Sequence, residues 1–307
     1  MRFHAPAKIN LHLRVGEPRA DGFHPLLSWM VTVGLFDILD VDRSTRPGYR
    51  LECDWPQVPT DGRNIVLKAV AALADYRAQG RVSGPVEDVG LTVRLQKSIP
   101  VGAGLGGGSS DGASILRVLN DLWQLGLSRQ ELADFAARFG SDLSFFFFAP
   151  SAICRGRGEI VRPAPLPKPR FALLALPQRE LPTPAVYRQF DQMRLGRPGV
   201  IEEEPDFNGW AGLDAIELLG RLVNDLEPAA FAIDPDLGRL RQDMEQTAGR
   251  AVRMSGSGSS LFTLFDGRPE AEAAAVKIAQ RHSVQAIAVD IGPPDAPAAD
   301  NGRASDQ

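Results

Sequence analysis

The sequence predicts an α+β protein of two domains. Its 307 residues are 44% hydrophobic and 23% charged, which suits a globular protein of one large or two ordinary domains. Helix-like and strand-like segments occur on both sides of residues 161–170, which contain four prolines. A proline-rich segment is stiff and extended. It is therefore expected to join a first domain, residues 1–162, to a second domain, residues 163–292.

The first domain mixes helices and strands. Residues 64–79 carry apolar side chains at helical spacing, and residues 89–96 alternate apolar with polar or small side chains, as in a half-buried strand. Apolar residues recur every third position over residues 113–122, which predicts another helix. A further helix is expected over residues 128–139, because Ser128 and a glutamate three residues later have capping-box spacing.

The second domain also combines the two kinds of element, which favours helices packed on a sheet. The expected elements are a buried strand over 171–177, a helix from about residue 235, a strand–loop–strand over 251–265, a helix after residue 269 and a short strand over 284–289. Residues 293–307 have almost no apolar bulk, so this tail is expected to be disordered.

Charge and composition narrow the functional classes. The net charge of −4 gives no bulk attraction to nucleic acid or to a membrane surface, and neither is expected as a partner. No apolar run approaches the ~20 residues of a membrane span, and the N-terminus lacks a signal-peptide pattern. Cys53 and Cys154 form neither a disulfide framework nor a zinc pattern, and the histidines have no metal-binding spacing. A cytoplasmic location is expected, without a dedicated metal site.

One short stretch carries an unusual number of glycines. IPVGAGLGGGSSDGAS, residues 99–114, has six glycines between Gly102 and Gly112. A predicted strand leads into it and a predicted helix leaves it, with Ser109, Ser110 and Asp111 as candidate caps of that helix. A helix N-terminus offers free N–H groups and partial positive charge. The fixed order of strand, loop and helix favours a phosphate-binding loop over a flexible linker.

The loop alone does not determine which type of phosphate loop it is. The stretch lacks the lysine of a Walker A loop. GAGLGG fits the G-x-G-x-x-G pattern of dinucleotide-binding folds, but that pattern expects an acidic residue about 20 positions later, at the end of a second strand. Asp121 is near that distance but lies in a helical pattern. A nicotinamide-dependent oxidoreductase therefore stays a disfavoured alternative.

Two further segments decide the preferred interpretation. APAKINLHLRV lies at the N-terminus and RMSGSGSSLF, residues 253–262, lies near the C-terminus. With the glycine-rich stretch between them, they resemble the three motifs of the GHMP kinase superfamily. The resemblance implies a fold of two α+β domains with the active site in the cleft between them, and a glycine-rich loop that holds ATP.

Within that superfamily, the segments RADGFH, GSDLSFF, GRGE and NDLEP resemble kinases of the non-mevalonate isoprenoid pathway. The resemblance implies that ATP, with Mg²⁺, phosphorylates the 2-hydroxyl of a cytidine-diphosphate-linked methylerythritol. RADGFH and NDLEP are specific to these kinases. Two further interpretations stay open: a kinase of homoserine or mevalonate, and a nucleotide-binding regulator without turnover.

The sequence departs from those kinases at two places. They usually have Ala-Asp-Val-Pro where this chain has Ser-Asp-Leu-Ser, residues 141–144, and often have tyrosine at the position of Phe23. The aspartate, Asp142, is kept. Phe23 can still stack on a base but has no hydroxyl with which to form a hydrogen bond.

The resemblance assigns roles to particular residues. Lys8 and Asp142 are the expected catalytic pair: Asp142 as general base, and Lys8 to polarise the acceptor oxygen or keep the aspartate charged. Asp142 precedes an apolar run, so it could instead be a helix or turn cap. The expected nucleotide-binding residues are Pro100, Gly102, Gly104, Leu105, Gly106, Gly107, Gly108, Ser109 and Ser110. A side chain at position 107 is expected to enter the space of the nucleotide.

A second group of residues is expected on the acceptor side. It consists of Asn10, Phe23, His24, Thr183, Gly256 and Gly258. Asn10 lies two positions from Lys8, so it should share its face of a strand. His24 is expected to bind the edge of the cytosine, and the two glycines are expected to let a second backbone turn approach the site.

Overall fold

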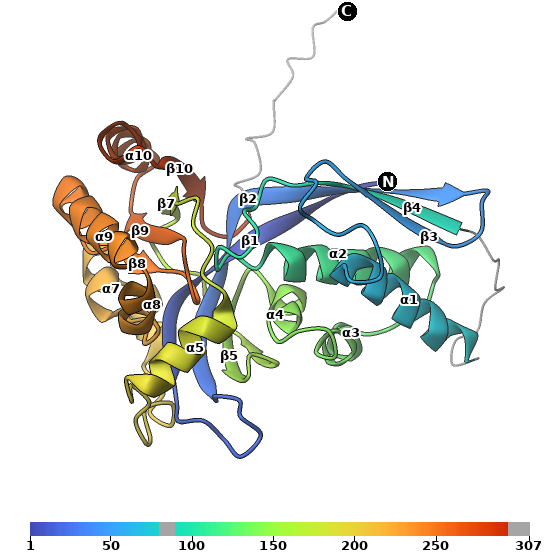
Figure 1. Cartoon of the computed structure of the whole chain (residues 1–307), viewed down its shortest axis with the longest axis horizontal. Helices are drawn as coiled ribbons and strands as arrows, with labels where there is room; N and C mark the ends of the chain where they lie inside the picture. The colour runs from blue at the N-terminus through green and yellow to red at the C-terminus, as the bar shows by residue number, and fades with distance from the viewer. Residues whose placement is uncertain (80–89, 294–307) are drawn as a thin grey trace, which may run out of the picture.

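The computed structural model describes residues 1–79 and 90–293, and it contains two sheets that lie next to each other (Figure 1). The predicted disordered tail falls, apart from Pro293, outside the described residues. No helix among the described residues is long and apolar enough to cross a membrane. The prediction of an α+β fold is confirmed.

The first sheet has six strands. They are β1 (Arg2–Val15), β2 (Leu26–Ser44), β3 (Tyr49–Cys53), β4 (Gly90–Gln96), β5 (Ser151–Gly156) and β6 (Ile160–Pro163). Their order is β3-β4-β2-β5-β6, with β1 paired along β2, and only β3 and β4 run parallel. One face of the sheet is covered by α1 (Ile65–Ala78), α2 (Gly107–Leu122), α3 (Arg129–Ala136) and α4 (Leu143–Phe148) (Figure 1).

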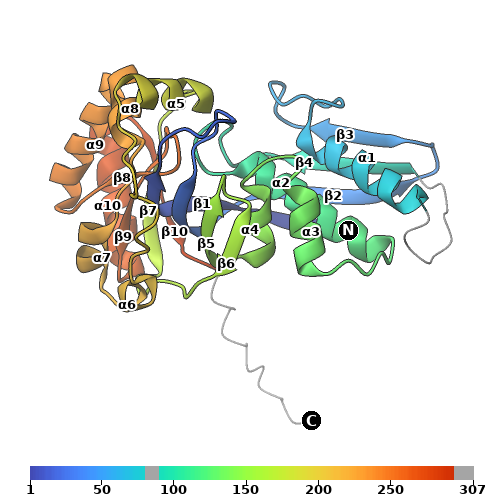
Figure 2. The same cartoon turned by 90° about the horizontal axis from the view of Figure 1, so that it is seen from below.

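The second sheet has four antiparallel strands in the order β10-β7-β9-β8. They are β7 (Phe171–Leu176), β8 (Arg253–Met254), β9 (Leu261–Phe265) and β10 (Gln285–Asp290). Its helices are α5 (Thr183–Gln192), α6 (Phe207–Ala211), α7 (Ala215–Arg221), α8 (Glu227–Ile233), α9 (Pro235–Ala248) and α10 (Arg268–His282). Helices α7, α9 and α10 gather at the end of the molecule opposite α1 and α3 (Figure 2).

Besides the covalent connection, isolated β-bridges between backbone groups link the two halves of the molecule. The end of β1 bridges Asn224 through Leu13, and β2 bridges Ile291 through Val33. The first sheet ends at Pro163 and the second begins at Phe171. We therefore propose that the domain boundary lies within this interval, next to the predicted division between residues 162 and 163.

Most predicted elements are present, and the reasons are local. Helix α1 buries its apolar stripe, and α3 begins with a capping box formed by Ser128 and Glu131. The predicted caps of α2 are wrong. Gly106, with a φ of +69°, is the N-cap, and α2 begins at Gly107, so Ser109 and the two residues after it lie within the helix. The left-handed glycine turns the loop into the helix earlier than the serines suggested.

Candidate active site

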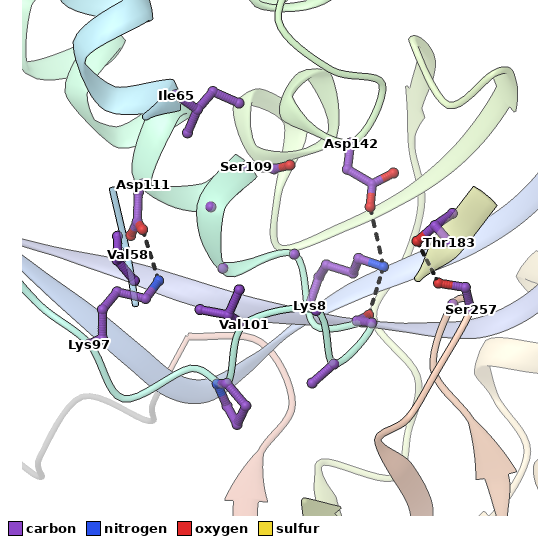
Figure 3. Close-up of a pocket in the computed structure, with 18 of the residues that line it drawn as sticks. Lys8, Val58, Ile65, Lys97, Val101, Ser109, Asp111, Asp142, Thr183 and Ser257 are labelled. Carbon is purple, nitrogen blue, oxygen red and sulfur yellow. Dashed lines mark hydrogen bonds and ion pairs between the residues drawn. The ribbon is translucent and has the colours of Figure 1, made fainter. Parts of the chain in front are cut away.

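A cavity of about 530 Å³ lies between the two sheets. Its walls come from β1, the glycine-rich loop, the start of α2 and Asp142 on one side, and from α5 and the loop before β9 on the other (Figure 3). The cavity thus lies in the cleft that the resemblance implied.

The glycine-rich loop is shaped by close backbone contacts. A Cβ atom at Gly104 would lie 2.1 Å from the carbonyl oxygen of Ser255, so only glycine fits there. Gly108 is different: it is exposed to the cavity, and a Cβ atom there would meet nothing closer than 4.0 Å. The first turn of α2 therefore presents its free N–H groups to open space, as an anion site requires.

The expectation for Gly107 is wrong. A Cβ atom at this position would lie 2.9 Å from Cγ2 of Ile99 and 3.2 Å from Nζ of Lys97. A side chain at Gly107 would therefore disturb the protein itself rather than enter the space of a nucleotide. Gly108 is the position whose side chain would point into the cavity.

Seven of the nine expected nucleotide-binding residues line the cavity. They are Pro100, Gly102, Gly104, Gly106, Gly107, Gly108 and Ser109. The side chains of Leu105 and Ser110 do not reach it: Leu105 packs in the core, and the fully buried Ser110 hydroxyl has no hydrogen-bond partner among the described residues. The helical twist of α2 turns Ser110 inward while Ser109 faces the cavity.

An apolar wall stands beside the start of α2. Val58, Ile65 and Val101 line the cavity there, and Val101 is 55% exposed (Figure 3). An apolar surface next to an anion site suits an aromatic base attached to phosphates. The sequence analysis had not singled out Val58 or Ile65.

Lys8 lies at the centre of the cavity, and its side chain is only 3% exposed. Its Nζ lies 3.3 Å from Oδ2 of Asp142 and donates to Oδ1 of Asn10 at 2.6 Å and to the carbonyl of Gly104 at 3.0 Å. Asp142 precedes α4, but its side chain makes no capping hydrogen bond. The side chain is directed to Lys8 instead, which favours the predicted pair over the alternative of a cap.

Asn10 and the two later glycines have unequal access to the cavity. Asn10 shares the strand face of Lys8, as expected, but it is buried and donates to Oγ of Ser28 at 2.8 Å. It therefore holds Lys8 rather than lining the cavity. Gly256 lines the cavity, whereas a Cβ atom at Gly258 would lie 2.7 Å from Sδ of Met254, away from it.

The acceptor-side residues lie around α5. Thr183 lines the cavity, and its hydroxyl is 2.8 Å from Oγ of Ser257. Tyr187, which the sequence analysis missed, also lines it, and burial together with the charge of Asp142 raises the pKa of its hydroxyl. His24 packs against Tyr187 with 5.0 Å between ring centroids, behind the cavity wall.

His24 and Phe23 differ in exposure. Nε2 of His24 lies 2.8 Å from Oδ1 of Asp191, and because a carboxylate only accepts, this nitrogen carries the proton. Phe23 is 51% exposed, and the guanidinium of Arg157 lies over its ring at 4.7 Å from the centroid. A Cβ atom at the neighbouring Gly158 would be 3.6 Å from Oδ1 of Asp142, so this corner adjoins the Lys8 pair.

A second buried lysine was also missed. Lys97 follows β4 directly, and its Nζ donates to Oδ2 of Asp111 at 2.9 Å (Figure 3). The same Nζ also donates to Asp37. Asp37 in turn accepts from the backbone N–H groups of Ser98 and Ile99, directly before the glycine-rich loop. Burial raises the pKa of Asp111 to about 7, because the Lys97 charge only partly offsets it. The cluster anchors both ends of the loop.

Family comparisons agree with this geometry. The family model for the GHMP kinases N terminal domain matches residues 64–149, and that for the GHMP kinases C terminal matches residues 212–284. A 4-diphosphocytidyl-2-C-methyl-D-erythritol kinase of Shouchella clausii is 36% identical over 85% of this chain and 84% of its own length. The chain belongs to the GHMP kinase family. The same kinase of a Nocardioides species is 37% identical over 89% of this chain and 91% of its own.

Solved structures give the same grouping. A crystal structure of 4-(cytidine 5'-diphospho)-2C-methyl-D-erythritol kinase matches with a TM-score of 0.74 and 34% identity, over 96% of this chain and all of the other. A homoserine kinase from Cytophaga hutchinsonii matches with a TM-score of 0.66 but only 17% identity, over 94% of each chain, which shows the shared fold alone. The family membership therefore excludes the oxidoreductase alternative. The first sheet agrees, because all its strand pairs except β3–β4 are antiparallel, whereas a dinucleotide-binding sheet is mostly parallel.

Proposed function

We propose that this protein is an ATP-dependent kinase that phosphorylates the 2-hydroxyl of 4-diphosphocytidyl-2-C-methyl-D-erythritol in the non-mevalonate isoprenoid pathway. The observation that carries the proposal is the buried Lys8 paired with the partly exposed Asp142, midway between the glycine loop and the acceptor side. The choice of acceptor rests on the relatives named for this substrate.

The donor end of the cavity fits ATP. The open first turn of α2 at Gly108 suits a phosphate chain, and the wall that includes Val101 suits the adenine. The Ser109 hydroxyl is the oxygen donor that would hold Mg²⁺ together with the triphosphate. When bound, the cation neutralises charge on the transferring phosphoryl group.

The Lys8 pair supplies the proton chemistry. Asp142 is placed to accept the proton of the attacking hydroxyl, and the adjacent Lys8 ammonium, 3.3 Å away, orients its carboxylate. Asn10 and the Gly104 carbonyl hold Nζ from the other side, so the cation is fixed before substrates bind. A positioned base contributes typically 10²–10⁴-fold to the rate.

The acceptor end fits a base linked to a diphosphate. Tyr187 and Phe23 offer aromatic faces for stacking, and Arg157 adds a cation at the rim. Nε2 of His24 lies 2.8 Å from Oδ1 of Asp191, and the imidazole packs behind Tyr187, so His24 is proposed to position the aromatic ring that meets the base. The proposed partners are thus small molecules, without nucleic acid or membrane, and the proposed location is the cytoplasm.

Release of ADP with different acceptors tests the assignment. We expect turnover with 4-diphosphocytidyl-2-C-methyl-D-erythritol and none above background with homoserine or mevalonate. Robust turnover of either of the latter, with none of the cytidine compound, would overturn it. Hydrolysis of ATP at equal rates without any acceptor would also count against a specific kinase.

The donor site has its own test in Gly108→Val. The new side chain would point into the cavity without meeting the protein, so we expect a folded variant with ATP affinity at least about tenfold weaker, or ~1.4 kcal/mol. Gly220→Val is the matched control, because Gly220 also lies in a helix with open space around it but away from the cavity. Calorimetry that gives both variants the same ATP affinity would contradict the phosphate site.

A further inference from the structure

The segment NDLEP, residues 224–228, has no role in the chemistry described so far. It runs from the connection after α7 into the first turn of α8, beside β8, which is the edge strand of the second sheet. Nδ2 of Asn224 donates to the carbonyl oxygens of Met254 and Gly256, both at 2.8 Å. Oε1 of Glu227 accepts from the N–H group of Met254, also at 2.8 Å. These two side chains satisfy edge-strand groups that another strand would otherwise pair with.

Asn224 is itself held firmly. It is 6% exposed, and its Oδ1 accepts from the N–H group of Leu226 at 2.9 Å. The segment is also bonded to β1, the strand that carries Lys8: Leu13 N donates to Val223 O at 2.8 Å and Asp225 N donates to Leu13 O at 3.0 Å. The amide group of Asn224 therefore has a fixed position relative to that strand.

The loop that Asn224 holds, residues 254–258, packs against the surroundings of Lys8. A Cβ atom at Gly256 would lie 3.4 Å from Nζ of Lys8 and 3.3 Å from Oδ1 of Asn10. Ser255 Oγ donates at 2.9 Å to the carbonyl of Gly104, the same oxygen that accepts from Lys8. The backbone of this loop thus borders two of the groups that fix the Lys8 ammonium.

We propose that Asn224 is a positioning residue for phosphoryl transfer: its amide fixes the loop 254–258 against Lys8 and Asn10. The inference rests on the proposed function, because it concerns the same lysine. Without Nδ2, two buried carbonyl oxygens lose their donor, and the loop can move away from Lys8. Small displacements of catalytic groups reduce rates strongly even where binding is retained. The start of α2 at Gly108 does not contact Asn224, so nucleotide binding should change little.

Asn120 provides a matched control. Its Nδ2 donates to Leu127 O at 3.1 Å and its Oδ1 accepts from Leu127 N at 3.0 Å, so it also holds a loop through its amide. It lies near the end of α2 and does not line the cavity. Asn120→Ala therefore removes a similar pair of bonds without affecting Lys8.

The test compares Asn224→Ala and Asn120→Ala by steady-state kinetics, with circular dichroism to establish folding. We expect kcat of Asn224→Ala to fall at least tenfold while KM for ATP stays within about twofold, and kcat of Asn120→Ala to stay within twofold of the parent. Asn224→Asp keeps the size of the side chain but places a carboxylate oxygen against the two carbonyl oxygens, so its kcat should fall at least as much as that of Asn224→Ala. This variant replaces Asn224→Ala in the test if the alanine variant does not fold. A folded variant at Asn224 with parental kcat, or equal losses in the two alanine variants, would overturn the proposal.

Hydrogen exchange makes the proposal independent of the acceptor. Amides of residues 254–258 should exchange faster in Asn224→Ala than in the parent, and at the parental rate in Asn120→Ala. Unchanged exchange in Asn224→Ala would overturn the positioning role. If the parent enzyme phosphorylates another acceptor instead of the cytidine compound, the proposed substrate is wrong. The role of Asn224 is then still decided by hydrogen exchange of residues 254–258 and by comparing kcat of the variants with that other acceptor.

Discussion

Lys8 and Lys97 are two buried lysines that line the same cavity, but their carboxylate partners differ in exposure. Each side chain is 3% exposed. The carboxylate partners of Lys97 are Asp37 and Asp111, both of which are buried as deeply as the lysine. The partner of Lys8 is Asp142, which is 33% exposed and opens to the cavity. A buried lysine sealed between carboxylates supports structure, whereas one with an open partner is available for a reaction.

The electrostatics follow from this difference. Burial alone would lower the pKa of Lys97, but Asp111 and Asp37 more than offset it and raise that pKa. The ammonium therefore stays charged next to two carboxylates whose side chains are at most 3% exposed. Around Lys8 the groups are one carboxylate, one amide oxygen and one carbonyl oxygen, so a substrate can still compete for the aspartate.

The largest expected effect is on stability, from Lys97→Met. Removing the cation would leave two buried carboxylates without their counterion, and breaking a buried pair in this way costs about 3–5 kcal/mol. We expect the free energy of unfolding, measured in urea, to fall by that amount. Lys277→Met, at an exposed position of α10, is the control and should change it by less than about 0.5 kcal/mol. Equal stability of the two variants would mean that Lys97 is not structural.

The next largest effect is on turnover, from Asp142→Asn. The amide has the same shape but cannot take up the proton, so kcat should fall by roughly 10²-fold or more while substrate binding changes little. Stability should fall by less than in Lys97→Met, because Asp142 is 33% exposed and the Lys8 ammonium keeps its bonds to Asn10 and to the Gly104 carbonyl. Steady-state kinetics measures the fall in kcat. Asp243→Asn is the control, because Asp243 is an exposed aspartate of α9. Turnover within a few-fold of the parent would transfer the base role to another group.

The sequence identified one of these lysines and not the other, for a physical reason. Lys8 stands within a motif whose neighbours carry the family resemblance, so its role could be inferred. Lys97 follows an alternating strand, where a lysine most often ends in solvent. Its burial depends on Asp37, sixty residues earlier in β2, and a pairing over that separation leaves no local pattern. Asp37 itself gives little signal, because the same strand carries further polar residues such as Asp40 and Asp42.

The same limit explains the errors in the glycine loop. The strand, the loop and the helix were predicted because each has a local pattern. The start of α2 at Gly107, and the tight contact of that glycine with Ile99, depend on how the loop folds back on β4. Which of Ser109 and Ser110 faces the cavity depends on the same start. A run of glycines has no side chains from which these details could be inferred.

The acceptor side of Lys8 gives a smaller, selective effect. His24→Ala removes the ring that packs behind Tyr187, so the aromatic face that Tyr187 offers to the cytosine base loses its support. We expect KM for the cytidine substrate to rise more than tenfold while KM for ATP changes by less than about twofold. Phe23→Tyr should be tolerated, because the ring is exposed and a hydroxyl has room. Equal increases in both KM values would place His24 in the fold rather than in the acceptor site.

The smallest expected effect returns to the Lys97 cluster and concerns pH. The pKa of Asp111 is raised from its ordinary 3.8 to about 7 by burial, so the folded state holds this proton more tightly than the unfolded state does. The resulting stabilisation is complete below about pH 4 and is lost as the pH rises through 7. Asp111→Asn removes the titration, so its stability relative to the parent should improve by ~1.4 kcal/mol between pH 6 and pH 8. Urea unfolding of both proteins across this range measures the difference. A constant difference would show that Asp111 stays ionised throughout, and that Lys97 alone compensates both carboxylates.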